Sequence, residues 1–165
     1  KTTLLRCLAG LQPADGRVGV FGRPPADEPD FWRDVVMAGE EPAWYPGLTV
    51  REHLELMGAV HGPAGARMDA GAALDLFDLT ARADLVPLSL STGQRQRLSL
   101  AMTLLRPSRV LLLDEPERGL DTEFRSRLAG IIAGYADGGG TVVMATHDLR
   151  LAEAAGARPV ILEAA

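Results

Sequence analysis

The sequence is poor in cysteine, lysine and aromatic residues, and it has no long apolar run. Its 165 residues include one cysteine, Cys7, which excludes an internal disulfide and a metal site built from cysteines. Lysine occurs once, at position 1, and the net charge of −5 argues against non-specific binding to nucleic acid. No apolar run approaches the roughly 18 residues that a membrane-spanning helix needs. The apolar fraction of 47%, with 24% charged residues, is instead typical of one globular domain.

Short apolar runs alternate with amphipathic segments along the chain. Strands are expected at 17–21, 35–38, 110–113, 141–145 and 158–162. Helices are expected at 2–9, 50–60, 72–77, 91–106, 122–135 and 148–155, and the segment 81–90 is left open. This alternation predicts an α/β fold with a parallel sheet covered by helices on both faces. The mainly helical block at 48–107 interrupts the alternation, and it predicts an inserted helical subdomain.

Two carboxylates follow the apolar run at 110–113. Asp114 and Glu115 would lie at the carboxyl end of a parallel strand, where open α/β folds bind their ligands. An aspartate there can hold Mg²⁺, and the neighbouring glutamate can polarise a water molecule for attack on a phosphate. A solvated strand end followed by a turn at Pro116 is the alternative interpretation.

The segment LSTGQ at 90–94 opens the helix expected over 91–106. With Ser91 as N-cap and Gly93 in the first turn, free backbone N–H groups and the helix dipole form a potential anion site. A plain capped helix with a polar face explains the segment equally well. His147 follows the strand expected at 141–145, where an imidazole can donate to a phosphate oxygen or be merely polar.

The order of these motifs is more informative than any one of them. They follow one another as Lys1-Thr2-Thr3, LSTGQ at 90–94, LLLDEP at 111–116, GLD at 119–121 and finally His147. This order and spacing resemble the ATP-binding subunits of ABC transporters over nearly the whole chain. The resemblance implies that residues 1–165 form one incomplete ABC ATPase domain of the P-loop NTPase type.

The resemblance implies roles in ATP binding and hydrolysis. Lys1, Thr2 and Thr3 would end the Walker A phosphate loop, whose glycines are expected before Lys1. Asp114, with Thr2, would hold Mg²⁺. Glu115 would be the catalytic general base, and His147 would be the catalytic switch histidine.

The family also builds each ATP site from two subunits. By the resemblance, Ser91, Gly93 and Gln94 form the signature motif, which contacts the γ-phosphate of the ATP held by the opposite subunit. Asp121 would belong to the D-loop that links the two sites. A head-to-tail dimer, as a homodimer or a heterodimer, with two ATP molecules at its interface is therefore implied.

Two positions depart from the family pattern. Glu40 stands where the family has the Q-loop glutamine. Its oxygen can still meet Mg²⁺, but it adds negative charge and loses a donor. Thr92 replaces a glycine of the signature motif, and its branched side chain is expected to weaken ATP-driven closure.

Two aromatic residues follow the Q-loop position, where the family docks its membrane subunit. Trp44 and Tyr45 suit an interface, and local packing is an equal alternative.

The leading hypothesis is an ATP-hydrolysing motor subunit of an ABC transporter, with ATP and Mg²⁺ as ligands. It would bind membrane-spanning subunits and no nucleic acid, at the cytoplasmic face of a bacterial inner membrane. One alternative is an ABC ATPase acting on ribosomes or DNA. Another is a nucleotide-binding module that does not hydrolyse ATP.

Overall fold

The computed structural model describes residues 1–26, 28–39, 42, 44–61 and 68–161. The chain forms two compact units. The first, called the sheet unit here, comprises Lys1–Gly39, Ser108–Glu117 and Thr122–Ala165. The second, called the helical unit, comprises Glu40–Pro107 and Arg118–Asp121.

Three parallel strands form the sheet unit's centre: β1 (Val35–Ala38), β2 (Val110–Asp114) and β3 (Thr141–Ala145), in the order β1-β2-β3. Leu111 of β2 pairs with Val36 on one side and with Val142 on the other. Strand β2 is buried from Val110 to Leu113, as expected for the middle strand of a sheet covered on both faces. The predicted parallel α/β sheet is therefore confirmed.

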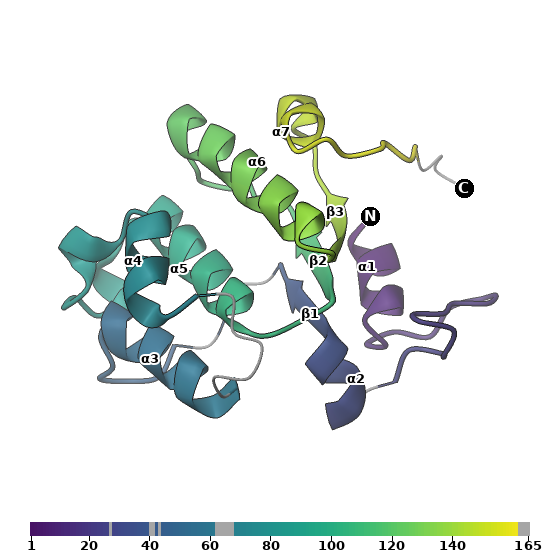
Figure 1. The fold of residues 1–165 in the computed structure, drawn as a ribbon, viewed down its shortest axis with the longest axis horizontal. Coiled ribbons are helices and arrows are strands. Elements are labelled where there is room, and N and C mark those ends of the chain that lie inside the picture. Colours follow the sequence, from purple (N-terminus) through teal and green to yellow (C-terminus); the bar gives the residue numbers. More distant parts are fainter. Residues whose placement is uncertain (27, 40–41, 43, 62–67, 162–165) are drawn as a thin grey trace. The chain divides into compact units, whose positions relative to one another are not determined.

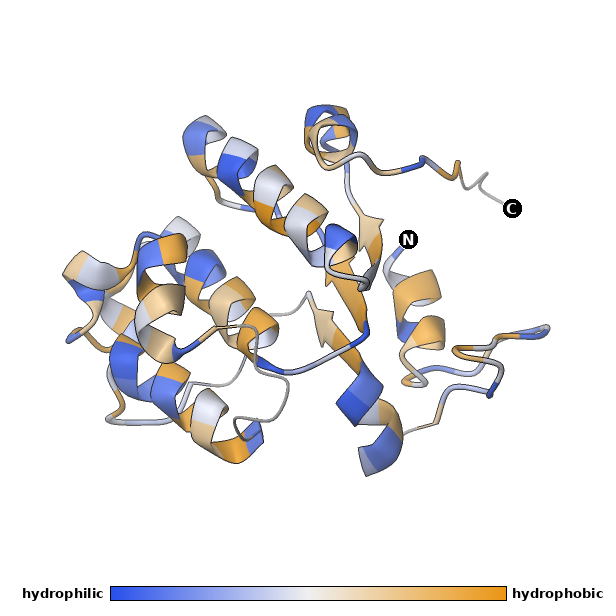
Figure 2. Ribbon diagram, in the orientation of Figure 1, coloured by the Kyte–Doolittle hydropathy of each residue, from blue (hydrophilic) through white to orange (hydrophobic). Residues whose placement is uncertain are grey.

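The described residues of the sheet unit also form four helices: α1 (Thr2–Leu8), α2 (Pro29–Asp34), α6 (Thr122–Asp137) and α7 (Leu149–Ala154). Figure 1 shows α1 on one side of β2 and β3 and α6 on the other. Leu5 and Ala9 pack with Val35, Val110 and Leu112 in one buried cluster. Figure 2 shows the same pattern as hydrophobic colour along β1, β2 and α1. Full burial of a valine or leucine side chain stabilises the folded state by about 1.5–3 kcal/mol.

Two of the expected strands are wrong. Within 17–21, the only pairing is an isolated antiparallel bridge between Val20 and Arg23, because the chain turns back at Phe21 and Gly22 with positive φ. Residues 158–161 form no strand, and Val160 and Ile161 are exposed; position 162 lies outside the described residues. Helix α2 was missed, although Pro29 is at its first position, where proline fits a helix well.

The helical unit contains α3 (Val50–His61), α4 (Ala70–Leu76) and α5 (Thr92–Leu105), with short 3₁₀ turns at Thr80–Arg82 and Pro87–Ser89. Leu54, Leu74 and Leu98 are fully buried in it. The N–H of Thr49 donates to Glu52 Oε2 at 2.7 Å, and Thr49 Oγ1 accepts from the Glu52 N–H at 3.2 Å. The first of these bonds lowers the pKa of Glu52. In the part of the chain that the structure describes, no helix is long and apolar enough to cross a membrane.

Candidate nucleotide site

The structure places the two predicted carboxylates at the carboxyl end of β2. Asp114 is the last residue of the strand, and Glu115 follows with a φ of +47°. That left-handed conformation is uncommon for a residue other than glycine, and such strain gathers at functional sites. The Glu115 N–H donates to the carbonyl of Ala145 at 2.8 Å, which ties the turn to the end of β3.

Gly39 leaves room for Asp114 at the end of β1. A Cβ on Gly39 would lie 2.9 Å from the Cβ of Asp114, which is closer than side chains tolerate. The chain leaving β1 therefore passes directly against the Asp114 side chain. Glu40, predicted as the Q-loop residue and a metal ligand, comes next and lies outside the described residues.

Three of the predicted residues meet at this edge of the sheet although they are far apart in sequence. Lys1 Nζ donates to the carbonyl of Thr146 at 2.9 Å and lies 3.2 Å from His147 Nδ1. His147 Nε2 lies 3.7 Å from Glu115 Oε1. The side chains of His147 and Glu115 are 74% and 48% exposed, so both are accessible to a ligand.

The donors expected for Mg²⁺ are of the right chemical kind. Thr2 and Thr3 lie exposed in the first turn of α1, and Asp114 is half-buried. Hydroxyl and carboxylate oxygens are hard donors of the type that Mg²⁺ prefers. The residues present therefore fit the ion.

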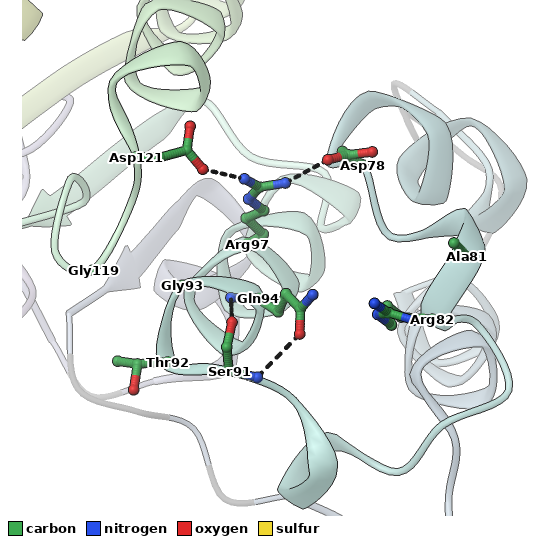
Figure 3. Close-up of a pocket in the computed structure, with 10 residues that line it drawn as sticks. All are labelled: Asp78, Ala81, Arg82, Ser91, Thr92, Gly93, Gln94, Arg97, Gly119 and Asp121. Atoms are coloured by element: carbon green, nitrogen blue, oxygen red, sulfur yellow. Dashed lines mark hydrogen bonds and ion pairs between the residues drawn. The ribbon is translucent and has the colours of Figure 1, made fainter.

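The first turn of α5 in the helical unit carries a complete capping box. Ser91 Oγ accepts from the Gln94 N–H at 3.3 Å, and Gln94 Oε1 accepts from the Ser91 N–H at 3.0 Å (Figure 3). Ser91 is thus the N-cap, as predicted, and Gln94 is its reciprocal partner. The pair fixes the start of a 14-residue helix whose dipole favours anions there.

Gly93 is required by a backbone contact in the same unit. A Cβ on Gly93 would lie 2.5 Å from the carbonyl oxygen of Gly119, an overlap that would force the backbone to shift. Gly119 itself has a φ of +72°, which favours glycine. The two glycines allow the segment 118–121 to pack against the first turn of α5.

Arg97 links three segments of the helical unit, a role that its position in the sequence did not predict. Its guanidinium donates to Asp78 Oδ2 and to Asp121 Oδ2, both at 2.6 Å, and its side chain is only 13% exposed. The predicted nucleotide-binding residue Asp121 is therefore oriented by α5. Arg97, Asp78 and Asp121 line a cavity of about 670 Å³ together with residues 91–94 (Figure 3).

The predicted docking residues pack against His53, for which no role was predicted. His53 is fully buried; its Nε2 accepts from the Tyr45 N–H at 3.0 Å, and its Nδ1 lies 2.8 Å from the carbonyl of Thr49. The rings of Trp44 and Tyr45 lie 5.8 and 5.9 Å from the imidazole. Trp44 is half-buried and Tyr45 is 51% exposed, so Tyr45 presents the larger free surface.

The chain is similar in sequence to known ATP-binding proteins. A family model described as ABC transporter matches residues 1–118. The cytochrome c biogenesis ATP-binding export protein CcmA of Bordetella bronchiseptica is 39% identical over 149 residues, covering 89% of this chain and 66% of that protein. The spermidine/putrescine import ATP-binding protein PotA of Acidothermus cellulolyticus is 38% identical, covering 90% of this chain and 40% of that protein.

A solved structure shares the fold. The ATP-binding cassette MJ0796, a dimer bound to ADP and Pi in a post-hydrolysis state, superimposes with a TM-score of 0.76 and 25% identity. The match covers 93% of this chain and 72% of that one. The chain thus spans only part of the length of each of these proteins. The matched family model and the curated relatives show that the chain belongs to the ABC transporter family and, within it, to the ATP-binding subunits.

Proposed function

We propose that the full protein hydrolyses ATP to drive a membrane transporter. The observation that carries this proposal is the meeting of Lys1, Glu115 and His147 at the carboxyl ends of β2 and β3. An ammonium, a carboxylate and an imidazole, all accessible there, are the groups that phosphate binding and water activation need. The names of the relatives, one an export protein and one an import protein, support transport without indicating its direction.

Each group has a distinct part in the proposed reaction. Lys1 would neutralise phosphate oxygens, Glu115 would accept the proton of the attacking water, and His147 would donate to the γ-phosphate. Thr2 and Asp114 would hold Mg²⁺, which supplies positive charge beside the phosphates. Catalysis would consist of positioning and electrostatic stabilisation, because phosphoryl transfer to water needs no covalent step on the protein.

We further propose that a second subunit completes each ATP site. The start of α5 would face the γ-phosphate bound by the opposite subunit, with Ser91, Gly93 and Gln94 at the contact. The capping box supports this because it presents the helix N-terminus in a fixed orientation. MJ0796, bound to ADP and Pi, is a dimer.

We also propose that Tyr45 and Trp44 contact the membrane-spanning partner, that the protein works at the cytoplasmic face of a bacterial inner membrane, and that nucleic acid is not a partner. Replacing Tyr45 with alanine should release the membrane subunit in co-purification because its ring is half exposed. Val60→Ala removes a comparably exposed apolar side chain from α3 and is the matched control. Equal retention of the partner by both variants would contradict docking at Tyr45.

Phosphate release by the full-length protein tests the activity itself. Glu115→Gln should lower the hydrolysis rate by about 100-fold or more, since the amide cannot accept the proton, and should leave ATP binding intact. Glu153→Gln, an exposed position on α7, is the matched control and should keep the wild-type rate. A wild-type protein that binds ATP without releasing phosphate would instead favour a non-hydrolysing module.

A further inference from the structure

Glu117 is a buried carboxylate that the motifs above leave without a role. It lies two residues after Glu115, in the sheet unit, and is 8% exposed. Its Oε1 accepts from Thr146 Oγ1 at 2.5 Å and from the His147 N–H at 3.2 Å. Among the described residues its Oε2 is buried and has no hydrogen-bond partner.

Both groups that Glu117 holds belong to the short connection between β3 and α7. Thr146 is also fixed from two other directions: its Oγ1 accepts from the Asp148 N–H at 2.9 Å, and its carbonyl accepts from Lys1 Nζ. The Glu117 carboxylate therefore anchors the backbone at Thr146 and His147 to the loop that follows β2.

Burying a carboxylate costs free energy unless hydrogen bonds satisfy it, so the two bonds to Glu117 offset a substantial penalty. A short bond from a hydroxyl to a carboxylate is of the strong, charge-assisted kind. Because the Glu117 side chain is held in this way, its hydrogen bond restricts the position of the His147 peptide far more than a bond to water would. The imidazole, by contrast, is largely exposed, so little of its surface is held by neighbouring side chains.

We propose that Glu117 is a positioning residue for the reaction. It fixes the His147 peptide and the Thr146 side chain so that the imidazole faces Lys1 and Glu115. The inference rests on the proposed ATP hydrolysis, and it adds to the site a residue that never touches the nucleotide.

Steady-state ATP hydrolysis by the full-length protein tests the role. Glu117→Ala should lower kcat by about tenfold or more, since small displacements of a catalytic group are costly, while the KM for ATP changes by less than about threefold. Glu117→Gln should recover most of the rate because its amide oxygen still accepts both hydrogen bonds. Leu128→Ala, which opens a cavity under α6, controls for instability and should lower the melting temperature with kcat retained.

A double-mutant cycle with His147→Ala separates positioning from general stability. If Glu117 acts through His147, then Glu117→Ala has little further effect on kcat once the imidazole is gone. An equal fold-loss in both backgrounds, or an unchanged kcat in Glu117→Ala alone, overturns the inference. Absence of hydrolysis in the wild type would instead refute the proposed function, so the two failures are distinguishable.

Thr146 provides a second route if Glu117→Ala does not fold. Thr146→Val removes the hydroxyl that donates to Glu117 and keeps the side chain's shape, whereas Thr146→Ser keeps the hydroxyl. The valine variant should lose kcat as Glu117→Ala is expected to, and the serine variant should retain most of it. Equal rates in the two variants overturn the inference.

Discussion

The two groups of site residues, one in each unit, are held in different ways. At the sheet edge, Lys1 meets Thr146 and His147, which are 145 and 146 residues away in sequence, and the side chains involved are exposed. At the start of α5, Ser91 and Gln94 are three residues apart and satisfy each other's backbone groups. Arg97, nearly buried, then fixes the surrounding loops through two ion pairs.

The two groups of site residues are thus positioned by different kinds of interaction. The signature segment is organised by local bonds that form with the helix itself. The sheet edge is assembled by topology, because parallel strands bring their carboxyl ends together. Its lysine, histidine and glutamate side chains are exposed, and binding of a phosphate would restrict their rotamers. One group is thus preorganised, and the other is arranged to respond to its ligand.

The preorganisation of the helical unit can be broken at Gly93. Gly93→Ala should destabilise the protein by about 1–3 kcal/mol, because the new methyl group would overlap the Gly119 carbonyl. Urea unfolding measures the loss. Gly130→Ala in α6 is the matched control, since nothing lies within 4 Å of its added Cβ, and it should stabilise by about 0.5–1 kcal/mol. Effects of the same sign at both positions would contradict the close contact.

The start of α5 could be predicted from the sequence because its signals are local. Ser91 as N-cap and Pro107 after the helix define both ends within a few residues. The acidic partners of Arg97 are 19 and 24 residues distant, and no spacing rule connects them. The capping bond that the Gln94 oxygen accepts was not predicted, although a glutamine three residues after the N-cap is the spacing of a capping box.

A strand could be predicted from its sequence only where another strand lies beside it and pairs with it. The runs at 35–38, 110–113 and 141–145 are strands in the structure, and each pairs with another of the three. The run at 17–21, where apolar residues alternate with Arg17 and Gly19, pairs among the described residues through one isolated bridge. Strand propensity mostly reports packing against neighbours, so a short apolar run alone cannot decide the outcome.

The sheet edge also has a local N-cap, Asp148, which acts as Ser91 does and can be removed by mutation. Asp148 Oδ1 accepts from the N–H groups of Arg150 and Leu151, at 3.0 and 3.1 Å, directly after His147. Asp148→Ala should cost about 1 kcal/mol in the stability of α7, the usual value of an N-cap. Asp137→Ala, at the last residue of α6, where an acid is unfavourable, should cost nothing.

The pH dependence of this loss provides a sharper test. The bond from the Leu151 N–H, together with those from Arg150 and Arg125, lowers the pKa of Asp148 in the folded state. A carboxyl whose folded pKa is lowered contributes stability that is complete above its unfolded pKa of about 3.9. That contribution is lost as the pH falls through the lower folded pKa, because the acid then protonates in both states.

The stability difference between wild type and Asp148→Ala should therefore be constant near neutral pH and shrink in acid below about pH 4. Amide hydrogen exchange in α7 reports it directly if the helix opens without global unfolding. A difference that persists unchanged in acid would mean that Asp148 acts through packing and not as a charged cap. Of the two caps, Ser91 and Asp148, only Ser91 in the helical unit would then hold its site through a polar capping bond. The two groups of site residues would then differ fully in how they are held.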